Sequence, residues 1–405
     1  MKKIAVIGAG ITGITSAYAL SRRGFDVRVY EQARYPAMET SYANGGQLSA
    51  SNAEAWNNWP NLIKGVRWMF NPQAPLLIHP LPTWPKLDWM LRFMAGIARY
   101  QTSTLTCLEM ALAARSLLQS WAEEEQIDYA RQDKGILHLY HTAQDLAAAQ
   151  KVNALLVQGG LERHVVTNEE MHQLEPALQG QYAGGLYTPG DASGDIHQFC
   201  VGLTAACERR GVHFYWQHSV KEIQRLSQGF WLEGDSPNAP WADQVDGVVI
   251  CAGVNSRQMA RWLGDRLPIY PVKGYSITLP LEDTLSRQAA PQVSLLDESV
   301  KLVCSRLGED RLRVAGTAEF AGVNKDIRTK RIQPLVRWVE KEFPQVCTEH
   351  AVPWAGLRPM LPDMMPRVGP GRYSGVYYNT GHGHLGWTLS AATAEMLAAQ
   401  VDSGQ

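Results

Sequence analysis

The chain has 405 residues, of which 45% are hydrophobic and 19% are charged, and its formal net charge at pH 7 is −1. This length predicts about two packed units, and the composition is that of a globular protein with sizeable cores. The near-neutral charge argues against a nucleic-acid partner, because the few basic clusters, such as residues 325–331, are typical of one face of a helix.

The six cysteines are scattered along the chain, at positions 107, 200, 207, 251, 304 and 347. They form no Cys-x-x-Cys pair. We therefore expect buried, reduced thiols in a cytoplasmic protein and no metal site. No run of about eighteen uncharged apolar residues occurs, so the sequence predicts no transmembrane helix.

The first thirty residues begin with basic and then apolar side chains, which imitates a secretory signal peptide. A signal peptide requires no glycines at fixed spacing, however, and we interpret this stretch as part of the folded protein. Residues 4–7 predict a buried parallel strand, residues 14–23 a helix, and residues 26–30 a second strand that ends at Glu31. Together they form one β-α-β unit.

A phosphate-binding turn is predicted between this strand and this helix, in the pattern Gly8-x-Gly10-x-x-Gly13. Gly8 permits a tight turn, Gly10 lets the backbone approach a pyrophosphate, and Gly13 lets the helix press against the strand. The helix N-terminus then faces the phosphates, and Glu31, eighteen residues after Gly13, accepts hydrogen bonds from the ribose hydroxyls. This order of features predicts dinucleotide binding; the alternative is a merely tight β-α turn.

The region after the β-α-β unit is harder to interpret. Residues 38–51 form a polar, Gly-rich loop, and residues 56–100 are rich in Trp and Pro and interrupted by basic residues. Two interpretations of residues 56–100 stay open. They form a patch that lies on a membrane and gives a quinone access to the site, or they form an ordinary lid or helix pair. Residues 112–125 and 145–157 have helical periodicity.

The second half of the chain changes its pattern. Residues 248–253 predict a buried strand that ends in a small pair, Ala252-Gly253. Period-2 alternation then predicts an antiparallel sheet whose strands cover residues 276–279, 300–306 and 311–318. Residues 326–343 predict an amphipathic helix.

The C-terminal stretch favours FAD over NAD. Residues 375–379 predict a strand, residues 380–386 a Gly-rich turn, and residues 387–401 a helix whose N-terminus is directed at the turn. Reduced flavin carries negative charge around N1 and O2, which a helix N-terminus stabilises by roughly 0.3–2 kcal/mol, whereas a nicotinamide gains nothing similar. The alternative is a simple helix start with glycine bends.

These elements predict an interleaved chain with two domains. The FAD-binding domain takes residues 1–55, 195–265 and 350–405. The substrate-binding domain takes residues 56–194 and 266–349, including the antiparallel sheet.

Four separated segments carry a resemblance to a known family. They are residues 39–49 (ETSYANGGQLS), 270–276 (YPVKGYS), 356–363 (GLRPMLPD) and 379–388 (NTGHGHLGWT). With the N-terminal turn, they make the chain similar to the D-amino acid oxidase family of FAD-dependent oxidoreductases, and within it to bacterial D-amino acid dehydrogenases of the small-subunit type. The likeness covers essentially the whole chain. It implies an α/β plus α+β fold, in which a glutathione-reductase-like Rossmann domain is interleaved with a substrate domain on a mixed, largely antiparallel sheet.

The resemblance also implies which residues hold FAD, from the adenine to the flavin. The loop of residues 41–49 lies along the pyrophosphate and ribityl chain, and Val220 contacts the adenine through its backbone. The full set is Gly8, Ala9, Gly10, Ile11, Thr12, Gly13, Glu31, Gln32, Ser41, Asn44, Gly45, Gly46, Gln47, Leu48, Val220, Ala252, Gly253, Gly356, Arg358, Gly381, His382, Gly383, His384, Leu385, Gly386, Trp387 and Thr388.

Three side chains are candidates for the catalytic site. Arg358 is expected to hold the substrate carboxylate, because a guanidinium offers two parallel charge-assisted hydrogen bonds; the alternative is a structural salt bridge. Tyr275 adds a hydroxyl to the carboxylate, shapes the side-chain pocket, or packs against the sheet. His384 bonds substrate or flavin, or is a satisfied core histidine. No dedicated general base is expected, since the cofactor takes the hydride.

The expected activity is FAD-dependent oxidative deamination of a D-amino acid. A hydride passes from Cα to flavin N5, the imino acid hydrolyses to a 2-oxo acid, and a quinone or other respiratory acceptor takes the electrons. Two alternatives stay open: oxidation of a cyclic or secondary amino acid (D-proline, D-hydroxyproline, sarcosine or glycine), and a non-catalytic flavin-carrying electron-transfer subunit. The expected location is the cytoplasm or, through residues 56–100, the inner face of the cytoplasmic membrane.

Overall fold

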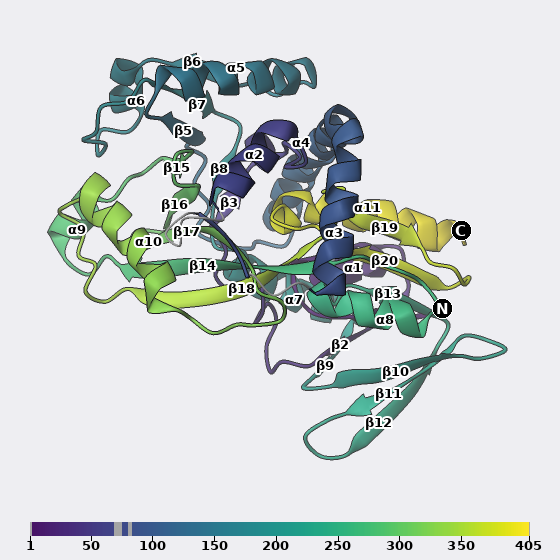
Figure 1. Cartoon of the computed structure of the whole chain (residues 1–405). Helices are drawn as coiled ribbons and strands as arrows, with labels where there is room; N and C mark the ends of the chain where they lie inside the picture. Colours follow the sequence, from purple (N-terminus) through teal and green to yellow (C-terminus); the bar gives the residue numbers. More distant parts are fainter. Residues whose placement is uncertain (1, 69–74, 80–82, 405) are drawn as a thin grey trace.

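The computed structural model describes residues 2–68, 75–79 and 83–404, and within them a largely parallel sheet lies beside a larger mixed sheet (Figure 1). The chain passes between the two sheets several times, because strands of each sheet come from both halves of the sequence. The interleaving predicted from the sequence is therefore a property of the fold.

The parallel sheet has the strand order β19-β20-β13-β1-β2-β9. Its strands are β1 (Lys3–Ile7), β2 (Asp26–Glu31), β9 (His213–Trp216), β13 (Gly247–Ile250), β19 (Arg367–Pro370) and β20 (Val376–Thr380). All neighbours are parallel except β19, which runs antiparallel to β20. The apolar run of β1 is buried because layers of structure cover both faces, which confirms the strand predicted over residues 4–7.

Helices cover one face of this sheet: α1 (Ile11–Arg22), α7 (Ile196–Arg209), α11 (Gly386–Ser403) and, behind them, α4 (Tyr100–Glu124). Small buried side chains such as Ala17 and Ala391 let α1 and α11 pack closely. The other face carries α8 (Ser256–Trp262) and a meander that the sequence analysis did not predict, formed by β10 (Ser219–Arg225), β11 (Phe230–Asp235) and β12 (Pro240–Val245).

The mixed sheet has the order β18-β14-β17-β16-β15-β5-β7-β6, with β4 alongside β17. Its strands are β4 (Leu76–Ile78), β5 (Ile136–Tyr140), β6 (His164–Val166), β7 (Gly184–Thr188), β14 (Tyr270–Pro280), β15 (Ser294–Asp297), β16 (Leu302–Leu307), β17 (Arg311–Phe320) and β18 (Val352–Met360). Most neighbours are antiparallel; β15 runs parallel to β5, and β17 to β4.

One face of the mixed sheet packs on a core beneath α6 (Asn168–Leu174), α9 (Thr284–Ala289) and α10 (Thr329–Glu342). Ile277 and Leu279 of β14 point into this core, and alternation along the strand sends Gly274 and Ser276 to the opposite face. That opposite face looks toward the loop of residues 41–49, which contains β3 (Gln47–Leu48) and continues into the short helix η1 (Ala50–Asn52).

The remaining elements are α2 (Trp59–Trp68), α3 (Trp84–Ala95), η2 (Gly96–Arg99), α5 (Ala143–Gln158), β8 (Ala192–Ser193) and η3 (Gly253–Asn255). Residues 69–74 and 80–82 of the patch predicted over residues 56–100 lie outside the described residues. In the described part of the chain, no helix combines the length and the apolarity needed to cross a bilayer.

Several expectations can be compared with these elements. The strands predicted over residues 276–279, 300–306 and 311–318 correspond to β14, β16 and β17. The expectation that all thiols are buried is wrong for Cys347, which is exposed because it follows the end of α10 on the surface. The domain division stays a prediction; β18, within the range given to the FAD-binding domain, pairs with β14 of the mixed sheet.

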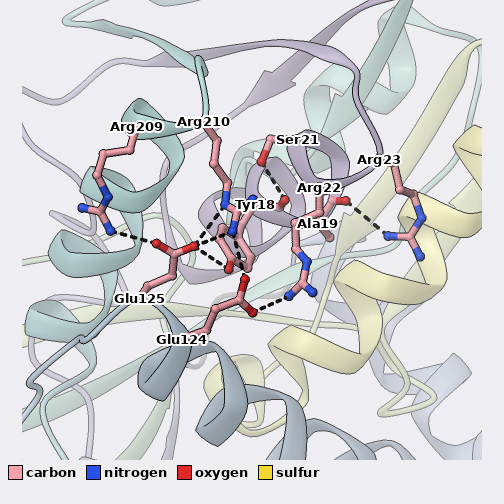
Figure 2. A network of polar contacts seen from close by, with 9 residues as sticks. All are labelled: Tyr18, Ala19, Ser21, Arg22, Arg23, Glu124, Glu125, Arg209 and Arg210. Carbon is pink, nitrogen blue, oxygen red and sulfur yellow. Dashed lines mark hydrogen bonds and ion pairs between the residues drawn. The ribbon is translucent and has the colours of Figure 1, made fainter.

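A half-exposed ionic network joins the C-terminal ends of α1, α4 and α7 (Figure 2). The carboxylate of Glu125 accepts hydrogen bonds from the hydroxyl of Tyr18 (2.8 Å), from Arg209 (2.8 Å) and from Arg210 (2.7 Å). Arg210 also bonds Glu124 at 3.0 Å and lies over the Tyr18 ring. Although burial acts to raise it, these hydrogen bonds hold the pKa of Glu125 below its usual value.

We expect Glu125→Gln to lower the free energy of unfolding at pH 7 by about 1 kcal/mol, because it removes the charge that two arginines share, and because solvent screens much of this attraction at a half-exposed site. The depressed pKa means that this contribution is present above the unfolded-state pKa of about 4.3 and is lost as the pH falls through the folded-state value. Urea unfolding of the wild type and the variant at pH 7 and near pH 4 measures both effects.

The matched control is Glu123→Gln, since Glu123 lies on the same helix and accepts a single exposed hydrogen bond from Gln119. It should change stability by less than about 0.5 kcal/mol. An equal loss for both variants would contradict the role of the network.

Candidate active site

The ends of three neighbouring parallel strands form one edge of the parallel sheet. Gly8 follows β1, Ala252 comes shortly after β13, and Gly381 follows β20. The chain after β1 enters α1 on one face of the sheet, whereas the chain after β13 enters α8 on the other face. A crevice at the carboxyl ends of strands, where connections diverge in this way, is the usual binding place for a ligand in such sheets.

The glycine turn is closed toward the protein and open toward this crevice. Gly8 has φ +102°, and a Cβ there would lie 2.7 Å from the carbonyl oxygen of Cys251. A Cβ at Gly13 would lie 1.9 Å from the carbonyl oxygen of Gly8, so helix and strand touch. At Gly10 the nearest atom is the Oγ of Ser41, at 3.5 Å. The turn therefore leaves room where the pyrophosphate of a dinucleotide has to approach, and it fits FAD.

Glu31 lies at the end of β2, beside this turn. Its carboxylate accepts hydrogen bonds from the backbone N–H of Ala9 (2.7 Å) and of Ala33 (2.8 Å), and burial raises its pKa. Gln32 is exposed, and Val220 is buried on β10. The chain enters β10 from His218, whose N–H donates to the carbonyl of Glu31. The structure thus brings the residues predicted for the adenosine end to one side of the turn.

The loop of residues 41–49 connects the glycine turn to the mixed sheet. At its start, the Oγ of Ser41 accepts a hydrogen bond from the N–H of Ile11, at the N-terminus of α1. Further along, the carbonyl of Gly45 accepts from Ser305 of β16 (2.8 Å). Asn44 closes the bend between them by accepting from the N–H of Gly46 (2.9 Å). The loop is thereby fixed across the crevice between the two sheets.

The C-terminal turn meets the same loop. Thr388, in the first turn of α11, accepts a hydrogen bond from the N–H of Ser49 (3.2 Å). A Cβ at Gly386 would lie 4.0 Å from Ile11, so the N-termini of α1 and α11 lie close together. The two glycine-rich turns near the ends of the chain therefore face one crevice, as a bound flavin dinucleotide requires.

Arg358 lies on β18, at the face of the mixed sheet that looks toward this crevice. Its guanidinium crosses over Gly274 and donates a hydrogen bond to the carbonyl of Thr317 on β17 (2.8 Å). A Cβ at Gly274 would lie 2.5 Å from the guanidinium carbon, so only glycine leaves this path open. Burial lowers the pKa of Arg358 to about 10, which still leaves it charged at neutral pH. No carboxylate among the described residues forms an ion pair with Arg358.

His384 forms part of the wall near Arg358. Its Nε2 lies 3.3 Å from the carbonyl oxygen of Asn52, and its ring stacks on Trp56 at 4.4 Å between centroids. Because a carbonyl only accepts, Nε2 carries the proton. Burial lowers the pKa of His384 to about 4, and the charge of Arg358 acts in the same direction, so the ring is neutral. His382 is buried and bonds Thr393 inside the helical layer.

Tyr275 lies on the other face of β14, away from Arg358. Its hydroxyl donates to Glu319 (2.9 Å) in a buried cluster that also contains Lys273. The structure therefore brings Arg358 and His384 together and does not bring Tyr275 to them. The reason is strand alternation, since Gly274 faces the crevice and its neighbours in the sequence cannot.

Four residues near Arg358 and His384 were not singled out by the sequence analysis: Asn52, Trp56, Gly274 and Thr317. Gly274 stands inside the segment YPVKGYS, and a glycine in the middle of a strand pattern is a signal of close approach by another group. Thr317 carries no such signal, because its role comes from its backbone.

Comparisons with known proteins agree with this geometry. The model of the DAO family, described as FAD dependent oxidoreductase, matches residues 3–400. The chain is 54% identical to D-amino acid dehydrogenase 3 of Mesorhizobium japonicum over 401 residues, covering 99% of this chain and 97% of that protein. It is 38% identical to D-amino acid dehydrogenase of Paramagnetospirillum magneticum over 407 residues, covering 98% and 94%.

Among solved structures, glycine oxidase from Geobacillus kaustophilus matches with a TM-score of 0.78 at 20% identity, covering 100% of this chain and 95% of that one. At this identity the likeness concerns the fold alone. It agrees with the predicted fold class, in which an FAD-binding domain is combined with a mixed sheet.

We expect Gly10→Ala to weaken FAD binding by about tenfold or more, because the new methyl group has room within the protein but projects into the space above the turn. The melting temperature of the FAD-free protein should not change. Gly13→Ala is the contrasting variant, since its Cβ would collide with the carbonyl of Gly8 and destabilise the FAD-free protein as well. Fluorescence titration with FAD and thermal unfolding measure the two effects; unchanged FAD affinity in Gly10→Ala would contradict this interpretation.

Proposed function

We propose that this chain, which belongs to the DAO family of FAD-dependent oxidoreductases, oxidises D-amino acids at Cα. It releases an imino acid, which water converts to a 2-oxo acid and ammonia. One observation supports an amino acid as the substrate. Arg358 is a half-buried cation beside the crevice that forms no ion pair in the described part of the chain. The names of the relatives support the D configuration.

Different residues of the crevice hold the cofactor and the substrate in this proposal. The glycine turn and Ser41 bind the diphosphate, Glu31 the ribose, and the loop of residues 41–49 and the turn before α11 the flavin. FAD supplies the acceptor for the hydride that leaves Cα, while the amine lone pair closes the C=N bond. Arg358 holds the carboxylate and so fixes the orientation of Cα.

His384 and Trp56 form a neutral wall beside the carboxylate site in this proposal. A neutral histidine whose Nε2–H is already donated to Asn52 does not compete with Arg358 for the carboxylate. The stacked rings also reduce the exposure of the site to water, which strengthens the interaction between the guanidinium and a bound carboxylate.

The anaerobic addition of substrates tests this function. We expect D-amino acids to bleach the flavin absorbance of the purified protein, and L-amino acids to leave it unchanged. Arg358→Met should raise KM for the D-amino acid by about 100-fold or more, because the carboxylate loses a charge-assisted pair with the guanidinium. Arg372→Met is the control, since Arg372 is exposed and lies over Tyr373, outside the crevice.

The same panel contains the alternative substrates. Bleaching by D-proline, sarcosine or glycine but by no primary D-amino acid would indicate a dehydrogenase of secondary or cyclic amines. Bleaching by none of these compounds would indicate an electron-transfer subunit, and either result would contradict the proposed substrate.

A surface stripe supports a membrane-bound acceptor as part of the proposal. On α3, the side chains of Trp84, Leu87, Leu91 and Met94 recur at helical spacing and are exposed; Trp59 and Ile63 on α2 are exposed as well. The buried face of α3 carries Trp89, whose Nε1–H donates to the carbonyl of Met360 on β18. A helix that is apolar on its outer face and joined to the site on its inner face suits contact with a lipid surface that contains quinone.

We expect the double variant Leu87→Ser/Leu91→Ser to bind vesicles of phosphatidylethanolamine and phosphatidylglycerol about tenfold more weakly, because two apolar side chains no longer enter the lipid. Reduction of a quinone embedded in the vesicles should fall, while reduction of a water-soluble dye stays unchanged. Val352→Ser is the control, since Val352 is equally apolar and exposed but lies on β18, away from α3. Sedimentation with vesicles measures binding, and equal binding by both variants would contradict the role of the stripe.

A further inference from the structure

A buried charged cluster lies on the face of the mixed sheet opposite to Arg358. Lys273 and Glu319 are 0% and 1% exposed, and their charged atoms are 3.5 Å apart. The Tyr275 hydroxyl donates to Glu319 (2.9 Å), and Arg328 approaches the same carboxylate to 3.1 Å. Lys273 also donates to the side chain of Asn324 (2.8 Å). None of these side chains faces the crevice, so the proposed chemistry does not use them directly.

A β-bulge connects this cluster to Arg358. Between β14 and β17, Lys273 is opposite Glu319 and Tyr275 is opposite Gly316, so β17 contains one extra residue at this place. Thr317, inside the bulge, has φ +61°. A β-branched residue rarely adopts this conformation, and it persists only where its surroundings enforce it.

The two faces of the bulge carry different groups. On the crevice side, the carbonyl of Thr317 leaves the ladder and accepts the hydrogen bond from Arg358 (2.8 Å). On the other side, two residues further along β17, Glu319 is held by the Tyr275 hydroxyl and the two cations. The contacts of Glu319 fix the end of the bulge, and the bulge fixes the direction of the carbonyl.

We propose that Glu319, with Tyr275 and Lys273, forms a positioning device for Arg358. The device acts through the β17 bulge and holds the guanidinium over Gly274, ready for the substrate carboxylate. The inference rests on the proposed function, in which Arg358 binds that carboxylate. It assigns Tyr275 a role in carboxylate binding that operates from the far side of the sheet and involves no contact with substrate.

The test uses the FAD-loaded protein and propionate, a carboxylate without an amine, whose binding is followed by the change in the flavin spectrum. We expect Glu319→Gln to bind propionate about tenfold more weakly and to raise KM for the D-amino acid, while kcat changes much less, because a displaced guanidinium mainly affects orientation of the carboxylate. Tyr275→Phe should act in the same direction by about threefold, since one of the bonds to Glu319 is lost.

One control separates positioning from general stability. Glu342 is also a buried carboxylate that accepts from a tyrosine hydroxyl beneath the same sheet, from Tyr182 at 2.6 Å, but it is remote from the bulge. Glu342→Gln should lower the melting temperature and leave propionate affinity unchanged.

The outcomes distinguish the inference from the proposed function. If Arg358→Met abolishes propionate binding while Glu319→Gln and Tyr275→Phe leave it unchanged, the positioning role is overturned and the function stands. If Arg358→Met itself binds propionate normally, the carboxylate role of Arg358 fails and the inference fails with it. Should Glu319→Gln not fold, Tyr275→Phe against Glu342→Gln decides the question alone.

Discussion

A cation held inside a protein without a counter-ion is unfavourable, and the half-buried Arg358 has no counter-ion in the described part of the chain. The neighbouring structure holds this cation in a fixed geometry. Gly274 provides the path, the Thr317 carbonyl provides one hydrogen bond, and β18 provides the attachment. The other donors of the guanidinium are left for a ligand. On the proposed function, a substrate carboxylate supplies the missing negative charge, so that binding offsets the unfavourable position of the cation.

The position of Arg358 is useful only if the cofactor is fixed relative to it. Hydride transfer needs the reacting atoms within about 3–3.5 Å of each other, which tolerates little movement between the two sheets. The loop of residues 41–49 supplies this fixed relation. It starts on the N-terminus of α1 through Ser41, bonds β14 and β16 through Ser276 and Ser305, and ends at Thr388 of α11. Each of its contacts therefore links the cofactor side of the crevice to the substrate side.

The parts of the site that depend on local sequence could be predicted. Gly8, Gly10 and Gly13 carry their spacing within one β-α-β unit, and residues 380–388 carry their glycines within one turn, so both were identified without knowledge of the fold. Arg358 was identified through resemblance and through the chemistry of a guanidinium. The meander of β10, β11 and β12 was not identified, because its short half-exposed strands lack a strong period.

The parts that depend on register could not be predicted. Tyr275 and Gly274 are neighbours in the sequence, yet only one of them faces the crevice, and the choice is made by the pairing of β14 with β17 and β18. The bulge at Thr317 adds one residue to β17, which shifts every later side chain of that strand relative to β14. Whether Tyr275 would touch the substrate was therefore a question about strand pairing, and its residue type alone could not answer it.

The charges of Arg358 and His384 affect the protonation state of a D-amino acid bound in the crevice. Burial holds the pKa of His384 at about 4 with the help of the Arg358 charge, so that, on the proposed function, the guanidinium and a neutral imidazole face the ligand at pH 7. The guanidinium pairs with the carboxylate of a zwitterion and repels its ammonium group. His384 carries no negative charge that would offset this repulsion, because its ring is neutral. The neutral amine is therefore the better-matched ligand, and its free lone pair is what closing the C=N bond requires. On the proposed function, one arginine both holds the substrate and favours the form of the substrate that can be oxidised.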